Sequence, residues 1–277
     1  MSEISVPEAL LKALTAASRD GRLALAYSGG LDSRFLAFTA HKVGLTPVLL
    51  HVAGPHVAPA ETKAALAAAR EMGFTVECFD FDPSTVDLAA AGRARCYVCK
   101  KALFSRLIAR LAEKSPRLPL CDGTNASDLT VFRPGRQALI ELGVRSPLAE
   151  AGIAKADIRR LGAAWRLPHP EQAARPCLLT RFPYGVTPSQ NALHTVAEVE
   201  AFLETLPEAV GLRYRLRYPE GKPSLHVEAA SVATDETLAL VKAKLFERFP
   251  ALRPTLTIRT FTKLSGYYDR PDVDFQA

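Results

Sequence analysis

Residues 28–33 have the types and the order of a phosphate-binding loop. The string Ser28-Gly29-Gly30-Leu31-Asp32-Ser33 follows a short apolar run and precedes a segment with helical spacing of apolar residues. Glycine permits a sharp turn and a close approach of the backbone to a ligand, which a Cβ atom would obstruct. The free N–H groups and the positive dipole end of the following helix favour an anion at the same place. The sequence therefore predicts a cradle for phosphate.

Asp32 adds a carboxylate to this cradle. Beside phosphate, a carboxylate is suited to bind Mg²⁺ or to cap the helix that we expect to open at Ser33. We expect Asp32 at the exposed rim of the loop. No lysine follows the glycines, so the loop is not of the Walker type, and we expect release of pyrophosphate rather than orthophosphate. The alternative is an ordinary Gly-Gly turn in front of a helix.

Cys177 is the second candidate for chemistry. It lies in a proline-stiffened segment in which Arg175 and Arg181 flank the thiol. Neighbouring guanidinium groups raise the thiolate fraction of a cysteine and can also hold an anionic substrate. The segment therefore predicts a nucleophilic cysteine. The alternative is a small buried hydrophobic residue, which is the common role of a free cysteine.

Three further cysteines raise the question of a metal. Cys96 and Cys99 are spaced C-x-x-C at the head of a predicted helix, and Cys121 could add a third ligand for a metal ion or an iron–sulfur cluster. A structural zinc needs four ligands, and the sequence has no second C-x-x-C pair. Packing of the helix beside the nucleotide site is the default expectation for these cysteines.

Composition restricts the class of protein. The chain has 277 residues and a hydrophobic fraction of 48%, enough for one large or two modest packed domains. No apolar run approaches the length of a membrane span, the first residues lack a signal-peptide pattern, and five cysteines without a regular framework favour reduced thiols. We therefore expect a cytoplasmic protein without a membrane partner. The formal net charge of +6 favours anionic ligands without distinguishing nucleotides from RNA.

Strand and helix patterns alternate through the first part of the chain. Apolar runs predict buried strands at 22–27, 46–52, 74–79 and 118–121, and helical spacing predicts helices at 6–18, 33–43, 58–72 and 96–114. This alternation is typical of an α/β protein with a doubly wound parallel sheet, in which ligands bind at the carboxyl ends of the strands. The glycine loop and the turn at 122–128 both follow such ends.

A proline-rich stretch interrupts this pattern between residues 166 and 185. Because proline is excluded from helix interiors and central strands, we place a domain junction there. We expect a nucleotide-binding domain at 1–165, an active-site linker at 166–190, and a small α+β domain at 191–277 for substrate binding or oligomerisation. In that last domain, the pattern predicts helices at 193–206 and 236–249 and strands at 212–218, 224–229 and 255–260.

Several segments together resemble one known family. The string at 28–33 resembles the PP-loop of the N-type ATP pyrophosphatases, which bind ATP and release pyrophosphate while they adenylate a substrate. The PP-loop alone indicates only that superfamily. Over nearly the whole chain and in the same order, further segments resemble the LarE-type ATP-dependent sacrificial sulfur transferases, namely 95–100, 122–125, 133–135, 143–152 and 177–185.

This resemblance implies an enzyme that uses ATP and Mg²⁺ to adenylate a carboxylate of a pyridinium dicarboxylate mononucleotide. The sulfur of a protein cysteine then passes into the product and leaves dehydroalanine, in the biosynthesis of the nickel-pincer cofactor of lactate racemase. By this resemblance, the residues that bind ATP are Ser28, Gly29, Gly30, Asp32, Ser33, Gly123 and Asn125, with Asp32 on magnesium. Those of the second site are Cys177 as sulfur donor, Arg181 as an orienting charge, Arg215 and Arg217 on the substrate phosphate, and Glu200.

Departures from the family pattern concern the substrate side. Thr180 stands where serine is usual, Phe182 replaces an aliphatic residue, Arg175-Pro176 replaces small residues, and His226 stands where arginine is usual. A solvated helix position is the alternative for Glu200.

Two other functions remain open, a tRNA thiolase or related ligase of the same fold and an ATP-binding module without catalysis. The absence of a dense Lys/Arg patch with interleaved aromatics disfavours RNA. We expect a small nucleotide-like substrate, no nucleic-acid partner and a homo-oligomer.

Overall fold

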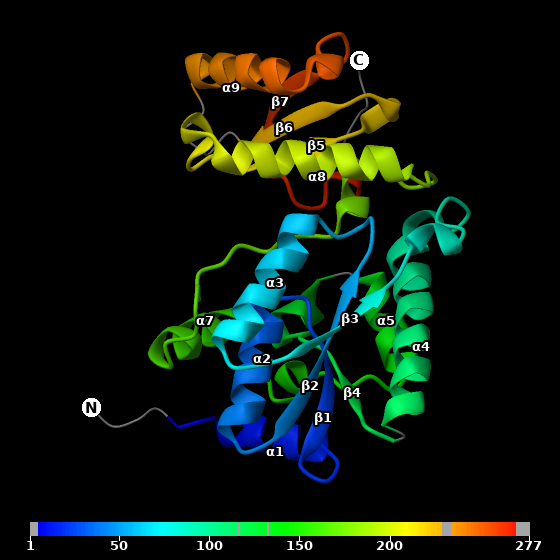
Figure 1. The fold of residues 1–277 in the computed structure, drawn as a ribbon, viewed down its shortest axis with the longest axis vertical. Helices are drawn as coiled ribbons and strands as arrows, with labels where there is room; N and C mark the ends of the chain where they lie inside the picture. The colour runs from blue at the N-terminus through cyan, green and yellow to red at the C-terminus, as the bar shows by residue number, and fades with distance from the viewer. Residues whose placement is uncertain (1–4, 116, 132, 229–233, 270–277) are drawn as a thin grey trace. The chain divides into compact units, whose positions relative to one another are not determined.

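The computed structural model describes residues 5–115, 117–131, 133–228 and 234–269 (Figure 1). The chain divides into two compact units, Met1–Pro176 and Cys177–Ala277. The division lies between Pro176 and Cys177, so the residues of the predicted linker at 166–190 are shared between the units.

The first unit is built on a parallel sheet of four strands in the order β3-β2-β1-β4 (Figure 1). The strands are β1 (Arg22–Ala26), β2 (Thr46–Ala53), β3 (Val76–Asp80) and β4 (Leu120–Cys121). All four lie at or within two residues of the ranges expected from the apolar runs. A parallel sheet of this kind has both faces covered, which explains the apolar, buried interior of β1, whereas the edge strand β3 carries exposed charged residues such as Glu77 and Asp80.

Helices cover both faces of this sheet. They are α1 (Glu8–Ala16), α2 (Leu31–Lys42), α3 (Pro59–Glu71), α4 (Arg95–Lys114), α5 (Pro134–Glu141), α6 (Pro147–Glu150) and α7 (Lys155–Ala164). Leu23 and Leu25 of β1 join a core that includes α1, α2, α3 and α7, whereas Ala24 joins a second core with α4 and α5. The prediction of an α/β fold with a helix-covered parallel sheet is confirmed.

The second unit contains a mixed sheet of three strands in the order β5-β6-β7. Its strands are β5 (Tyr214–Arg217), β6 (Ser224–Glu228) and β7 (Thr257–Phe261), and its helices are α8 (Gln190–Thr205) and α9 (Asp235–Arg248). Strand β6 pairs antiparallel with β5 and parallel with β7. The apolar side chains of α8 that are buried include Leu193, Val196, Val199 and Leu203.

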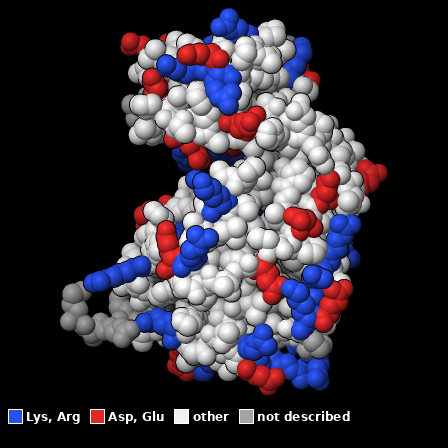
Figure 2. All heavy atoms as spheres, in the orientation of Figure 1, with Lys and Arg blue, Asp and Glu red and all other residues white. Residues whose placement is uncertain are grey.

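The surface mixes charges of both signs. On the face drawn in Figure 2, Lys and Arg side chains alternate with Asp and Glu side chains rather than forming a single basic area. Among the described residues, no helix is both long and apolar enough to cross a membrane.

Candidate functional site

The glycine loop connects the end of β1 to the start of α2. Gly30 is the N-cap of α2, and Gly29 has a φ of +76°, a left-handed conformation that side chains other than glycine rarely adopt. A Cβ atom on Gly29 would lie 2.3 Å from the Cβ atom of Ala65 on α3. Glycine at position 29 is therefore required both by the backbone conformation and by the approach of α3.

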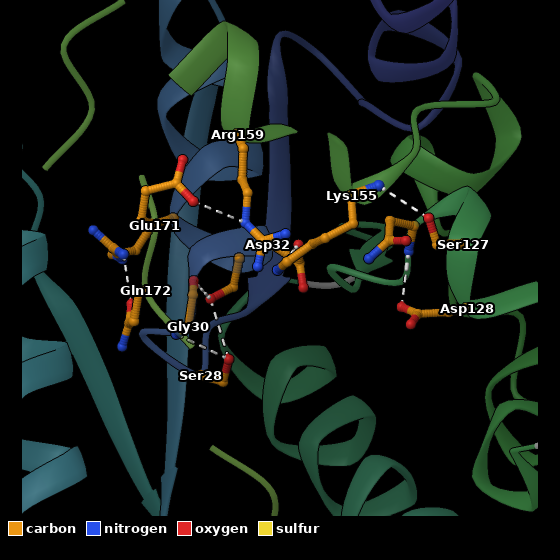
Figure 3. A network of polar contacts seen from close by, with 12 residues as sticks. Ser28, Gly30, Asp32, Ser127, Asp128, Lys155, Arg159, Glu171 and Gln172 are labelled. Atoms are coloured by element: carbon orange, nitrogen blue, oxygen red, sulfur yellow. Dashed lines mark hydrogen bonds and ion pairs between the residues drawn. The ribbon is translucent and has the colours of Figure 1, made fainter. Parts of the chain in front are cut away.

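Two hydroxyl groups line this loop (Figure 3). The Oγ atoms of Ser28 and Ser33 lie 3.2 Å apart, and the Ser33 hydroxyl donates to the carbonyl of Gly30 at 3.0 Å. The N–H of Gly30 reaches the Ser28 Oγ at 3.3 Å. The first N–H groups of α2 have no partner within the helix, so the loop combines amide and hydroxyl donors at a positive dipole end. This arrangement suits an oxyanion.

From the sequence we expected Asp32 at the exposed rim of the loop, as a magnesium ligand or as the helix cap. In the structure it neither lies at that rim nor caps the helix. It belongs to the first turn of α2, because the helix begins at Leu31 rather than at Ser33. Its Oδ1 accepts a hydrogen bond from the Nζ of Lys155 at 2.6 Å, and both side chains are about one quarter exposed (Figure 3). A carboxylate in the first turn is favoured by the helix dipole.

Lys155 is a site residue that sequence reasoning missed. It is the first residue of α7, and its backbone N–H donates to the Ser127 Oγ at 3.0 Å (Figure 3). Lysine was absent from the sequence next to the glycines, and the fold supplies one from a segment more than 120 residues away. Hydrophobic spacing carries no signal for such a contact, although the acidic residue in the first turn of α7, Asp157, marks the helix start.

The end of β4 lies against the start of α2. A Cβ atom on Gly123 would lie 3.0 Å from the backbone N of Ser33, so glycine permits this close approach. Asn125 is buried, and its backbone N–H donates to Asp128 Oδ2 at 3.2 Å. The structure therefore brings the predicted residues of the glycine loop together with Gly123 at one edge of the parallel sheet.

The cysteines at 96, 99 and 121 do not form a metal centre. Cys96 is exposed, Cys99 is buried, and the Cys121 thiol lies in the core with its Sγ 3.8 Å from the carbonyl of Ala17. Burial raises the pKa of the Cys121 thiol to about 12, which opposes the thiolate that a metal requires. Within the described part of the chain, no group of three His, Cys, Asp or Glu residues could hold a metal ion. The suggestion of a cluster at these cysteines was wrong, because Cys121 is buried in the core that includes α1, whereas Cys96 is exposed on α4.

Cys177 begins the second unit and is exposed. It precedes a short 3₁₀ helix, Leu178–Arg181, and its carbonyl accepts hydrogen bonds from the backbone N–H of Thr180 at 3.0 Å and from the Thr180 hydroxyl at 2.7 Å. Threonine at position 180, where serine was expected, thus keeps the hydroxyl contact to the cysteine backbone. The alternative of a buried hydrophobic cysteine is wrong for this residue.

Arg181 and Glu200 form a buried ion pair in the second unit. Arg181 is 3% exposed and donates from Nε and Nη2 to the two carboxylate oxygens of Glu200, at 2.9 and 2.7 Å. Glu200 also accepts from the backbone N–H of Leu216 at 2.9 Å. Glu200 is therefore not a solvated helix position. This bidentate geometry orients the guanidinium beside strand β5.

Arg215 and Arg217 lie on the same face of β5, as strand alternation predicts. Arg217 is 5% exposed, and its guanidinium carbon lies 4.5 Å from the ring centre of Tyr267. Its Nε has no hydrogen-bond partner among the residues that the structure describes. Burial and the charges of Arg181 and Arg215 lower the pKa of Arg217 to about 10. Burial, and then the charge of Arg181, also lowers the pKa of Arg215. The guanidinium groups of Arg181, Arg215 and Arg217 thus lie close enough to affect one another, and the Glu200 carboxylate offsets part of their charge.

Comparison with known proteins shows the family. No protein-family model matches the chain. An uncharacterised protein of Synechocystis is 36% identical over 67% of this chain and 69% of its own length, and one of Methanocaldococcus jannaschii is 29% identical over 67% and 70%. The pyridinium-3,5-bisthiocarboxylic acid mononucleotide synthase of Lactiplantibacillus plantarum is 32% identical over 70% of this chain and 71% of its own length. The chain belongs to the LarE family.

His226, which we singled out from the sequence, lies in the interior of the second unit. It is fully buried, its ring is stacked on Phe261 at 4.3 Å between centres, and its Nδ1 lies 3.3 Å from Nη1 of Arg217. Burial, and then the charges of Arg217 and Arg259, lower its pKa to about 3. His226 is therefore neutral near pH 7 and adds no charge.

Proposed function

We propose that the protein is an ATP-dependent sulfur transferase that converts a carboxylate of a pyridinium dicarboxylate mononucleotide into a thiocarboxylate. Membership of the LarE family carries this proposal. The glycine loop supports it, because its donors suit the phosphates of a nucleotide. The PP-loop type of this fold, and a place in nickel-pincer cofactor biosynthesis, are parts of the same proposal.

ATP would bind along the glycine loop through Ser28, Gly29, Gly30 and Ser33, with Gly123 and Asn125 beside it. Asp32 would hold Mg²⁺ and exchange its contact with Lys155 for the metal. A single protein carboxylate is a suitable donor set, because Mg²⁺ is commonly bound by one or two carboxylates together with substrate phosphates and water. The bound metal would neutralise charge on the phosphates during adenylation.

The reaction would proceed in three steps. A substrate carboxylate oxygen attacks the α-phosphorus of ATP, and pyrophosphate leaves with the electron pair of the broken P–O bond. The Cys177 thiolate attacks the resulting acyl adenylate, a C–S bond forms, and AMP leaves. A base then removes the Cα proton of Cys177, the Cβ–S bond breaks, and the thiocarboxylate departs while dehydroalanine remains in the chain.

In the second unit, Arg215 and Arg217 would bind the phosphate of the substrate, and the Arg181–Glu200 pair would orient it. The unpartnered Nε of Arg217 supports this assignment, because a buried donor without a partner is costly unless a ligand satisfies it. We expect the enzyme to act in the cytoplasm as a homo-oligomer.

Intact-mass measurement after turnover tests the proposal. The spent chain should be lighter by the mass of hydrogen sulfide, with the loss mapped to position 177. Cys177→Ser should still release pyrophosphate but form no thiocarboxylate, because oxygen cannot supply the sulfur. Cys78→Ser is the matched control, since Cys78 is also an exposed free cysteine. Multiple turnovers with an intact Cys177 would instead indicate a relay thiolase, and absence of any pyrophosphate would leave only an ATP-binding module.

A further inference from the structure

Arg34 is a charged side chain in the interior of the first unit that the proposed reaction does not use. It lies on α2 directly after the glycine loop and is only 1% exposed. Its guanidinium donates to neutral oxygens in two separate segments, the glycine loop and the turn at 168–172. Within the described residues, no carboxylate forms an ion pair with it. Burial lowers the pKa of Arg34, and the charge of Glu71 offsets this only in part. A buried cation hydrogen-bonded to neutral oxygens is costly, so its position calls for a role.

On the side of the glycine loop, Arg34 fixes one peptide plane. Its Nε donates to the carbonyl of Gly29 at 3.1 Å. Because the peptide unit is planar and trans, the direction of this carbonyl also sets the direction of the Gly30 N–H on the opposite side. That N–H is one of the donors of the phosphate cradle, next to the Ser28 hydroxyl. Arg34 therefore holds a cradle amide in its orientation from behind.

On the other side, Arg34 holds the turn that leads to Cys177. Nη1 donates to the carbonyl of Pro168, and Nη2 donates to the carbonyl of His169 at 3.2 Å and to Oε1 of Gln172 at 2.5 Å. His169 has a φ of +50°, a conformation that is unfavourable for a residue with a side chain. The guanidinium thus stabilises a strained turn through two consecutive carbonyls.

Chain connectivity ties this turn to the thiol. Only residues 173–176 separate Gln172 from Cys177. An extended chain advances at most about 3.6 Å per residue. The Cα atom of Cys177 therefore lies within about 18 Å of the Cα atom of the anchored Gln172. The limit follows from the covalent chain alone and holds for any placement of the second unit.

We propose that Arg34 is a positioning residue that couples nucleotide binding at the phosphate cradle to the anchoring of the segment that carries Cys177. The link is one guanidinium that bonds the Gly29 carbonyl and the 168–172 turn at the same time. Nucleotide that stabilises the cradle then also stabilises the turn, and an anchored turn raises nucleotide affinity by the same factor. This inference rests on the proposed function for the identity of the nucleotide and of the thiol.

Hydrogen exchange of the full chain, with and without ATP and Mg²⁺, tests the link. In the wild type, the amides of the non-proline residues within 167–176 should exchange more slowly when ATP is bound. Arg34→Met should raise their exchange rate about tenfold without nucleotide, because the turn opens more easily once its hydrogen bonds to the guanidinium are lost. It should also abolish the response to ATP. Arg34→Lys should restore part of the protection, since an ammonium can reach one carbonyl but cannot bridge the two segments.

Gln172→Ala keeps the test decisive if the Arg34 variants do not fold. It removes one acceptor from a half-buried position and should raise exchange of the turn severalfold. Glu171→Ala is the matched control, because Glu171 lies on the same turn, is 78% exposed and pairs with Arg159 instead. It should leave exchange at 167–176 unchanged.

Kinetics separate this link from a purely structural role. In Arg34→Lys, pyrophosphate release should persist with a raised KM for ATP, while the yield of thiocarboxylate per pyrophosphate should fall about tenfold. Equal exchange at 167–176 in the wild type and in folded Arg34 and Gln172 variants would overturn the inference. Wild-type protein that releases no pyrophosphate would overturn the proposed function instead, and the nucleotide-free exchange of the variants would still decide whether Arg34 anchors the turn.

Discussion

Arginine side chains occupy interior positions in both units, and their partners differ. Arg34 is held by neutral carbonyl and amide oxygens, whereas Arg181 is held by the carboxylate of Glu200. Arg217 has an aromatic neighbour, Tyr267, and retains an unpartnered Nε. Burying a guanidinium costs free energy that only specific partners offset, so the kind of partner indicates the kind of role. Neutral carbonyls indicate positioning of backbone, and an unpartnered donor indicates a ligand.

Lys155 provides a test at this scale. A magnesium–nucleotide complex remains anionic, and the ammonium lies 2.6 Å from Asp32 at the cradle. We expect Lys155→Met to raise the KM for ATP about tenfold, the effect of one charge-assisted hydrogen bond, with little change in the KM for the carboxylate substrate. Pyrophosphate release measured against ATP concentration checks this.

The control for Lys155 is Lys12→Met. Lys12 is an exposed lysine of the same unit, on α1, where it pairs with Glu8. Its removal should leave the KM for ATP unchanged. An unaltered KM in Lys155→Met as well would show that the ammonium serves only to neutralise Asp32.

At the scale of elements, the sheet of the second unit places polar groups in its interior. His226 on β6 lies opposite Arg215 on β5, and its ring packs between Phe261 and Tyr267. All residues of β6 are buried, so alternation of polar and apolar residues does not describe its environment. The result is a neutral histidine beside a buried arginine.

This histidine predicts a dependence of stability on pH. Its pKa in the folded protein is about 3, below the ordinary value of 6.5. Between these values the unfolded chain binds a proton that the folded chain does not, so the free energy of unfolding should fall as the pH falls. His226 should contribute up to about 1.4 kcal/mol per pH unit to the slope of the unfolding free energy against pH. Urea unfolding between about pH 7 and about pH 5 measures this slope.

His226→Gln should flatten this dependence, because glutamine does not titrate. His194→Gln is the control, since His194 is exposed on α8 of the same unit. It should keep the slope of the wild type. A slope in His226→Gln equal to that of the wild type would show that other groups cause the acid sensitivity.

At the scale of the whole molecule, each unit carries its own polar site. The phosphate cradle lies entirely within Met1–Pro176, and the arginines of β5 lie within Cys177–Ala277. If the first site binds ATP and the second binds substrate, their affinities should change separately on mutation.

Arg215→Ala and Arg217→Lys test this separation. Each should raise the KM for the substrate about tenfold or more, because a charge-assisted bond to phosphate is lost, while the dissociation constant of ATP measured by calorimetry stays unchanged. Arg213→Ala is the matched control, since Arg213 is 70% exposed and pairs with Glu228. A collapse of ATP affinity in the Arg215 or Arg217 variants would contradict the assignment of these arginines to the substrate.

Local patterns in the sequence were sufficient to predict the parallel sheet, its flanking helices and the glycine loop. The central strand β1 is buried and therefore appears as an apolar run, whereas the edge strand β3 is largely exposed, and Gly29 is required by its own backbone conformation. Helices α5 and α6 were not predicted, because they are short and begin with proline, and the ten-residue helix α7 was also missed. Strength of local signal decided what could be predicted.

Tertiary structure alone decided which distant groups meet. Lys155 reaches Asp32, Arg34 reaches the turn at 168–172, and Glu200 takes both donors of Arg181. Within the described residues it also brought no three His, Cys, Asp or Glu side chains together as a metal site, despite the spacing of Cys96 and Cys99. Hydrophobic periodicity records only which face of an element is buried, whereas these contacts depend on how the elements pack. Local patterns specified the parallel scaffold and the glycine loop, and packing determined the charged partners that surround them.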